Sequence, residues 1–212
     1  MTLSKDPYSD YKIIASGSSG NAVRVEDMLF DIGVSYKELK DDLYHIKYIF
    51  ITHRHSDHIN PKTLIAIQKH FPRIKWIANY DVAQRMPIDE VIGDTTRIAL
   101  KDRMVQSFPC AHDIPTHGFV IEMDGKTMIY ATDTHNLNRA PKIKYDAMFL
   151  ESNHDEKKIE IVREGARKKY GYDAWAGAMR HLSTQRSKAF YFMHRRSSES
   201  LWVELHKSNR FY

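Results

Sequence analysis

The sequence predicts an α+β domain with a layered αββα arrangement. Short apolar runs broken by Gly- or Asp-containing turns dominate the first half of the 212 residues and indicate strands and hairpins. Strand and helix patterns are mixed in the second half, which favours helices packed outside a pair of sheets. No linker, low-complexity run or internal repeat interrupts the chain, so we expect a single domain over residues 1–212.

The first half begins with a strand and a tight, Gly-rich turn at Ser16–Asn21. A hairpin is expected to turn at Glu26–Asp27. Ser35 is a suitable N-cap for a short helix ending at Asp42, and Pro61 suits the first turn of a helix over Pro61–His70. The strands expected in this half are Tyr11–Ala15, Ala22–Val25, Met28–Phe30, Tyr48–Ile51 and Lys75–Ala78.

The second half contains a strong hairpin signal at Asp124-Gly125. A helix is expected over Asp155–Lys169, because acidic residues stand at its start and basic residues at its end, as the helix dipole prefers. A second helix is expected over Tyr172–Met179. The strands expected here are Met104–Phe108, Phe119–Met123, Thr127–Ala131, Ala147–Leu150 and Ala189–Phe192.

Four side chains capable of binding metal crowd into six positions, at His53, His55, Asp57 and His58. Imidazole and carboxylate groups are common ligands of Zn²⁺ and similar ions. Ligands this dense cannot all serve one tetrahedral ion from one strand face, so the cluster predicts two metals side by side with an activated water between them. The alternative is a polar surface loop with chance histidines.

The cluster needs further ligands from elsewhere in the chain. Three candidates follow predicted strands or helices: His112 in Pro-Cys-Ala-His-Asp, Asp133 in Ala-Thr-Asp-Thr-His and His181 in Met-Arg-His-Leu-Ser.

The composition is that of an ordinary globular protein, with 42% hydrophobic and 28% charged residues. No apolar run has the length of a membrane span, and the N-terminus lacks a signal pattern. Cys110 is the only cysteine, which excludes an internal disulfide. We therefore expect a cytoplasmic protein that is not bound to a membrane.

The chain carries a formal net charge of +5, and its basic residues concentrate in the final third. Such a balance favours an anionic partner, nucleic acid first. A solvated helix face with an ordinary basic tail explains the charge equally well.

These residues together resemble the metallo-β-lactamase superfamily. The shared pattern is His-x-His-x-Asp-His, then a single His, an Asp after a strand and a last His, preceded by Phe30-Asp31-Ile32-Gly33. Short motifs further resemble the YycJ/WalJ-type branch, which implies an αββα sandwich and a 5′-to-3′ exonuclease acting on DNA. Those motifs are Ser16-Gly17-Ser18-Ser19-Gly20-Asn21, Thr132-Asp133-Thr134, Leu150-Glu151-Ser152-Asn153-His154-Asp155 and His181-Leu182-Ser183.

The resemblance implies two divalent metal ions, Zn²⁺ or Mn²⁺, and a ligand set. Asp31 would support the His loop by hydrogen bonds rather than bind metal. The implied ligands are His53, His55 and His112 for the first ion, Asp57, His58 and His181 for the second, and Asp133 as a bridge.

In this scheme a hydroxide shared by the metals attacks phosphorus, and Asp57 orients it. His154 is the candidate general acid and His135 the second choice, although either is as readily a surface residue. The Gly-rich turn predicts substrate contacts from Ser18, Ser19 and Asn21. Arg180 stands where the family usually has Gly, and we expect it to contact a phosphate rather than to be a plain surface residue.

Two other functions fit the sequence. The first is a small-molecule metallohydrolase of the same fold, acting on a phosphodiester, thioester or lactone. The second is a non-enzymatic DNA-binding protein with a relic site. No obligate protein partner is inferred in any of these cases.

Overall fold

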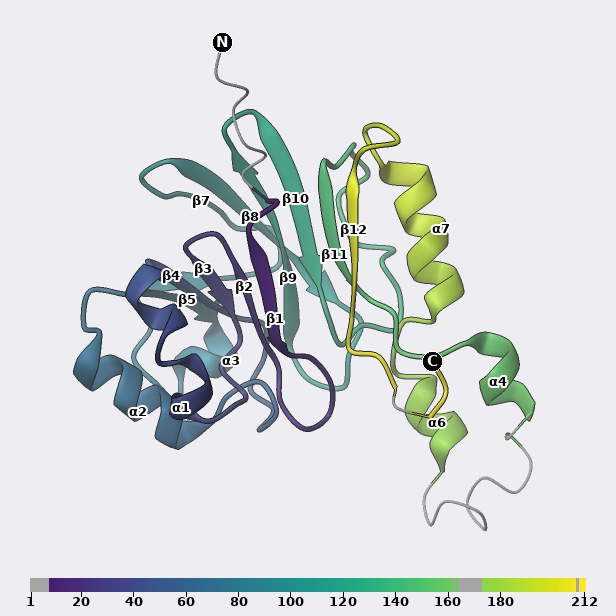
Figure 1. The fold of residues 1–212 in the computed structure, drawn as a ribbon, viewed down its shortest axis with the longest axis horizontal. Helices are drawn as coiled ribbons and strands as arrows, with labels where there is room; N and C mark the ends of the chain where they lie inside the picture. Colours follow the sequence, from purple (N-terminus) through teal and green to yellow (C-terminus); the bar gives the residue numbers. More distant parts are fainter. Residues whose placement is uncertain (1–7, 162, 164–172, 209) are drawn as a thin grey trace.

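Two six-stranded β-sheets lie face to face (Figure 1). The computed structural model describes residues 8–161, 163, 173–208 and 210–212. The first sheet has the order β1 (Tyr11–Ala15), β2 (Ala22–Val25), β3 (Met28–Phe30), β4 (Tyr48–Ile51), β5 (Lys75–Asn79) and β6 (Glu90–Ile92). The second has the order β12 (Leu201–Leu205), β11 (Ala147–Glu151), β10 (Lys126–Ala131), β9 (Thr116–Met123), β8 (Arg103–Cys110) and β7 (Arg97–Ala99).

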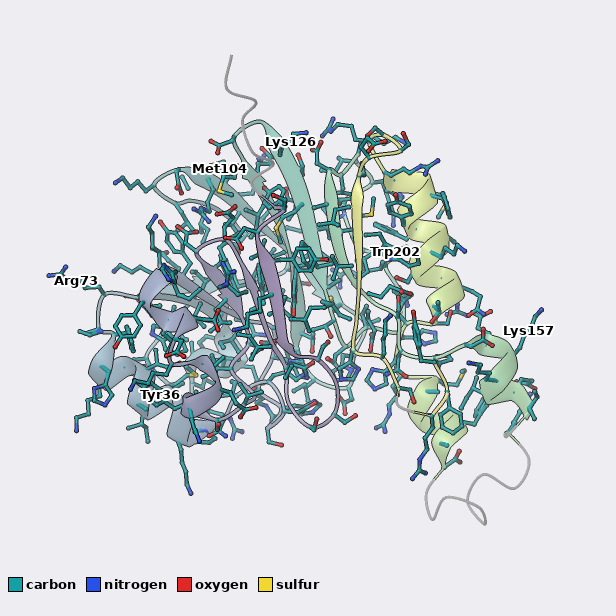
Figure 2. The ribbon with its side chains drawn as sticks, in the orientation of Figure 1. Tyr36, Arg73, Met104, Lys126, Lys157 and Trp202 are labelled. Atoms are coloured by element: carbon teal, nitrogen blue, oxygen red, sulfur yellow. The ribbon has the colours of Figure 1, made fainter. Side chains whose placement is uncertain are left out.

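Side chains fill the space between the two sheets (Figure 2), and those of the buried core there are apolar, several of them aromatic. The ring of Phe30 from the first sheet stacks on Tyr130 from the second, with centroids 4.1 Å apart, and also on Phe50, at 5.1 Å. Phe119 closes the group edge-on against Phe50 at 5.0 Å. All four rings are buried, and burying each contributes roughly 1.5–3 kcal/mol. This core fixes how the sheets sit on each other.

Helices cover the outer face of each sheet (Figure 1). The helices on the first sheet are α1 (Tyr36–Leu39), η1 (Asp42–His45), α2 (Pro61–His70) and α3 (Tyr80–Ala83). On the second sheet lies α7 (Thr184–His194). Two short helices, α4 (Glu156–Ile161) and α6 (Ala174–Ala178), lie beyond the ends of β11 and β12. The predicted αββα architecture is therefore confirmed.

The predicted helix starts are confirmed in the first half of the chain. Ser35 is the N-cap of α1, and the side chain of Asn60 accepts hydrogen bonds from two backbone N–H groups at the start of α2. Pro61 fits the first position because its missing N–H would have had no helical partner.

One strand prediction is wrong. Residues 189–192 belong to α7, although Ala-Phe-Tyr-Phe has the apolar character of a strand. The Ser183 side chain caps this helix by accepting a hydrogen bond from Arg186 N. The buried residues of the helix, Ser187, Phe190 and Tyr191, are three and four positions apart from the first, as on one face of a helix. The last strand is instead β12, which the sequence reasoning missed.

The two helices expected before α7 are present in part. The helix expected over Asp155–Lys169 is described from Glu156 to Ile161, and residues 162 and 164–169 lie outside the described part. The second, expected over Tyr172–Met179, is found at Ala174–Ala178, and Tyr172 lies outside the described part.

Parallel strands bring their carboxyl ends to one edge of the sandwich. β3, β4 and β5 run parallel in the first sheet, as do β10, β11 and β12 in the second. Three residues just after these ends take left-handed backbone angles that non-glycine residues rarely adopt: Asp31 (φ 61°), Asp133 (φ 50°) and His206 (φ 52°). Such conformations gather at functional sites.

No helix in the described ranges is both long and apolar enough to span a membrane.

Candidate metal centre

Three histidines from two loops face one another at this edge. The Nε2 atom of His53, just after β4, lies 3.0 Å from Nδ1 of His55. The Nε2 atom of His112, just after β8, lies 3.3 Å from the same Nδ1. The sequence predicted that these residues meet, and their ring nitrogens are close enough to bind one ion.

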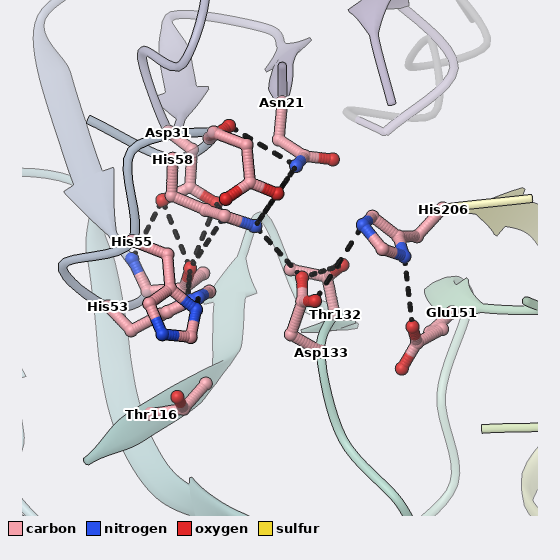
Figure 3. A network of polar contacts seen from close by, with 12 residues as sticks. Asn21, Asp31, His53, His55, His58, Thr116, Thr132, Asp133, Glu151 and His206 are labelled. Carbon is pink, nitrogen blue, oxygen red and sulfur yellow. Dashed lines mark hydrogen bonds and ion pairs between the residues drawn. The ribbon is translucent and has the colours of Figure 1, made fainter. Parts of the chain in front are cut away.

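A second group lies beside the first. It joins Asp57 and His58 to His206, which directly follows β12. Asp133 lies between the groups, with its Oδ2 atom 2.9 Å from His58 Nε2 and its Oδ1 atom 3.7 Å from His206 Nε2 (Figure 3). Asp133 also forms a possible ligand group with His53. Its position therefore suits a carboxylate that bridges two ions.

Asp31 holds the histidine loop in place, as the sequence predicted. Its carboxylate accepts hydrogen bonds from the Thr52 backbone N–H at 2.8 Å and from the Thr52 hydroxyl. It lies 2.7 Å from Nδ1 of His58, on the ring edge away from Asp133 (Figure 3). A carboxylate on the far nitrogen fixes a ligand histidine's orientation and raises its basicity.

The Gly-rich turn over residues 16–21, here called the serine loop, forms hydrogen bonds with two segments that carry candidate ligands. Asn21 N donates to Asp57 O at 2.7 Å, and His206 N donates to Ser16 Oγ at 2.7 Å. Asn21 is buried, and its amide lies 3.0 Å from His58 Nε2 and bonds to the Gly17 backbone. Asn21 therefore supports the ligand loop and is not the substrate contact that the sequence predicted.

Glu151 is a fully buried carboxylate at the end of β11 that joins two histidines. It lies 2.6 Å from His181 Nδ1 and 3.2 Å from His206 Nδ1, and it also accepts from Thr134 N. His181 Nδ1 lies 3.5 Å from Asp133. His181 thus reaches the cluster, but the nitrogen on this side already faces Glu151.

The site's charges are strongly coupled. Burial lowers the pKa of His58, but Asp31 and Asp133 outweigh it and raise that pKa well above the usual value. Burial raises the pKa of Asp133, yet His206 and His58 outweigh it and hold that pKa well below the usual range. Burial and the neighbouring His58 depress the pKa of His53. Buried carboxylates of this kind need positive charge beside them.

The donor set fits divalent metal ions. Among the described residues, the buried Nε2 atom of His206 has no hydrogen-bond partner, although it faces the Asp133 carboxylate at 3.7 Å. Imidazole nitrogens and carboxylate oxygens are the ligands that Zn²⁺ and Mn²⁺ accept. A cation held by these atoms would satisfy both the orphaned nitrogen and the buried negative charge.

His206 and Glu151 are the functional residues that the sequence reasoning missed. His206 lies outside the ligand pattern described from the sequence, and the structure places it in the cluster. Its signal was the run Leu201–Leu205, where Leu, Val and Leu alternate with other residues before the histidine. Recognising that run as a strand would have placed His206 at a strand end.

The other predicted site residues line a cleft and a pocket beside the cluster. Ser18, Ser19 and Arg180 are exposed and line an open cleft of about 1030 Å³, which His181 and His206 also reach. His135 and His154 line a separate pocket of about 210 Å³ that shares only His181 with the cleft.

Comparisons with known proteins place this geometry in context. The family model described as "Beta-lactamase superfamily domain" matches residues 29–195. Exodeoxyribonuclease WalJ from Streptococcus pneumoniae is 31% identical over 74% of this chain and 65% of its own length. Exodeoxyribonuclease YycJ from Bacillus anthracis is 28% identical over 73% and 66%. The chain thus spans slightly less than two thirds of these relatives, and their names confirm the YycJ/WalJ-type resemblance.

Solved structures share the fold at low identity. Human tRNase Z, short form, matches with a TM-score of 0.69 and 18% identity, covering 94% of this chain and 93% of that one. The metallo-beta-lactamase fold protein YhfI from Bacillus subtilis matches with a TM-score of 0.67 and 11% identity, covering 94% and 86%. These likenesses show the fold, and the family model that matches residues 29–195 shows that the chain belongs to the beta-lactamase superfamily.

Proposed function

We propose that this protein is a metal-dependent nuclease with two divalent ions, Zn²⁺ or Mn²⁺, that degrades DNA from the 5′ end. The observation that carries the proposal is the pair of ligand groups joined by Asp133. Two ions side by side suit phosphodiester hydrolysis, because they stabilise both the attacking and the leaving oxygen. The relatives named exodeoxyribonucleases support DNA as the substrate.

The ligands divide between two ions in this proposal. His53, His55 and His112 would hold the first, the group of Asp57, His58 and His206 would hold the second, and Asp133 would serve both. When bound, the ions lower the pKa of a shared water towards neutrality and offset charge on the phosphoryl oxygens. The side chain of Asp57 is 25% exposed, so its carboxylate can orient the attacking water from the open side.

The cleft beside the cluster supports a polymeric anion as substrate. Among the described residues, its lining includes the cations Arg180, Lys207 and Arg210 and one acid, Asp173. Phosphate contacts by such side chains supply most of the sequence-independent affinity for DNA. An open cleft also favours DNA over a small substrate, for which an enclosed pocket is usual.

His181 is better placed as the proton donor than as a metal ligand. Burial lowers its pKa, but Glu151 and Asp133 outweigh that and raise the pKa above the usual value, which favours the protonated form of the ring. As the P–O3′ bond breaks, the 3′-oxygen takes a proton from this ring, and Glu151 steadies the imidazole. His154 and His135, the donors expected from sequence, line the pocket on the other side of His181.

A nuclease panel tests the proposal. Linear, nicked and circular DNA, and RNA, would be incubated with the protein and Zn²⁺ or Mn²⁺, with either a 5′-phosphate or a 5′-hydroxyl end. We expect release of nucleotides from the 5′ ends of linear DNA, none from closed circles, and loss of activity with a chelator. Untouched DNA together with hydrolysis of a small phosphodiester or thioester would show a small-molecule hydrolase instead.

A further inference from the structure

Two hollows meet at His181, and α6 separates them. The residues of α6 on one face, Ala174 and Gly177 among them, line the cationic cleft. On the other face Trp175, together with Met179 just beyond the helix end, lines the smaller pocket. A strand whose phosphates follow the cleft to the cluster would therefore find a second, separate hollow at its end.

The smaller pocket has a different chemistry from the cleft. Its one arginine, Arg186, is paired with Glu156, with Nε 3.5 Å from the carboxylate, and a second acid, Glu160, lies on the same wall. Among the described residues, the arginine of this lining is therefore already paired with a carboxylate. The remaining wall is apolar, from Ile159, Trp175 and Met179, with histidines at its edge. A flat, uncharged ring with polar edges matches such a lining.

Two histidines of the pocket lining have buried ring nitrogens without a hydrogen-bond partner in the described part of the chain. His154 is 2% exposed, and its Nδ1 atom has no hydrogen-bond partner among the described residues. Nδ1 of His135 is likewise buried and unpaired in that part of the chain. Both histidines thus place polar rings in a wall that is otherwise largely apolar.

Trp175 provides an aromatic surface in the wall. The guanidinium of Arg163 lies over this ring at 4.7 Å from its centroid, and the indole still forms part of the pocket lining. Bases stack on exposed aromatic side chains in many proteins that bind single strands. The volume of about 210 Å³ is smaller than the roughly 300 Å³ that drug-sized ligands begin to fill. One heterocycle fits it better than a base pair.

We propose that this pocket, between α4 and α6, binds the nucleobase of the terminal nucleotide that the enzyme releases. The inference rests on the proposed nuclease function and adds to it a base-binding subsite beyond the cleaved phosphodiester. The terminal base must leave its pair to enter, so the pocket distinguishes a strand end from the interior of a duplex. It supplies a physical reason for an exonuclease to act at ends.

Calorimetric titration of the metal-loaded protein with two ligands tests the subsite. The ligands are deoxyadenosine 5′-monophosphate, as the released product, and 2-deoxyribose 5-phosphate, which lacks the base. We expect the nucleotide to bind at least about tenfold more tightly, as one stacked base provides. Trp175→Ala removes most of this difference and Trp175→Phe keeps it, while Tyr80→Ala, at an aromatic side chain 68% exposed on α3, leaves it unchanged.

Equal affinity for the two ligands, or a Trp175→Ala variant that weakens both alike, overturns the subsite. Circular dichroism checks that Trp175→Ala folds. Should it not fold, Met179→Trp narrows the pocket from a half-exposed position and is expected to weaken only the nucleotide. A protein that degrades DNA without base-dependent binding refutes the subsite alone. A protein that binds the nucleotide through its base yet leaves all DNA intact refutes the nuclease function alone.

Discussion

Replacing His206 with alanine separates the two roles that the structure assigns to neighbouring histidines. His206 is proposed to bind the second ion, and His181 to donate a proton. Both rings face the same Glu151 carboxylate and lie 5.0 Å apart, so the chain offers a closely matched pair of substitutions. We expect His206→Ala to lose one ion per protein and His181→Ala to keep both.

The size of the effect follows from the ligand count. The second ion would have four protein ligands, His206 being one of them. Four ligands of a typical zinc site together provide about 10–16 kcal/mol, so each accounts for roughly 3 kcal/mol. Loss of His206 therefore lowers the affinity of the protein for that ion by about two powers of ten. His181→Ala instead lowers kcat by about 10²–10⁴, the usual contribution of a general acid.

Metal content after dialysis, measured by mass spectrometry, gives the number of ions per chain, and titration calorimetry gives the affinities. His45→Ala is the control, because His45 is exposed and belongs to none of the ligand groups found among the described residues. If the His181→Ala variant lost one ion and the His206→Ala variant kept two, His181 would be the metal ligand and His206 would not, which is the reverse of the proposal.

Three further substitutions test the support, the core and the cleft. Asp31→Asn keeps the shape but removes the charge facing His58, so metal affinity measured by calorimetry should fall about 10–100-fold; an unchanged affinity contradicts the supporting role. Phe30→Ala should lower the free energy of unfolding, measured with urea, by about 3–5 kcal/mol, because it removes the ring that stacks on Tyr130 between the sheets. Ile65→Ala, at a residue 65% exposed, should lower the same free energy by less than about 0.5 kcal/mol. Similar losses of stability in the Phe30→Ala and Ile65→Ala variants would contradict the role of Phe30 in the core. Arg180→Ala should reduce the salt slope of DNA binding by about one; Arg73→Ala, on the opposite side of the molecule (Figure 2), should not, and equal slopes would remove Arg180 from the interface.

The sequence was sufficient to predict the layers of the fold and most of the cluster. Ligands such as His53 and His58 lie within six positions of each other, and Asp133 lies two residues after the end of a clear apolar strand, so local patterns revealed them. The αββα class followed because period-two strands and hairpin turns are signals carried by a few adjacent residues.

The last ligand has a weaker local signal. His181 stands in a recognisable His-Leu-Ser motif, whereas His206 follows only the short alternating run Leu201–Leu205, and the pairing of β12 with β11 is what brings it to the cluster. The same limit applies to Asn21. Its motif indicated a substrate contact, but burial and the hydrogen bonds to Gly17 are properties of the folded chain.

The serine loop contacts residues beside both sheets, whose described strands do not pair with one another. It bonds to Asp57 beside the first sheet and, through Ser16, to His206 beside the second. The candidate ligands likewise come from both sheets. A small displacement of one sheet over the other would therefore separate the ligands while leaving the hydrogen bonds between strands within each sheet intact. Heat inactivation is therefore expected to begin below the temperature at which far-ultraviolet circular dichroism reports loss of the strands.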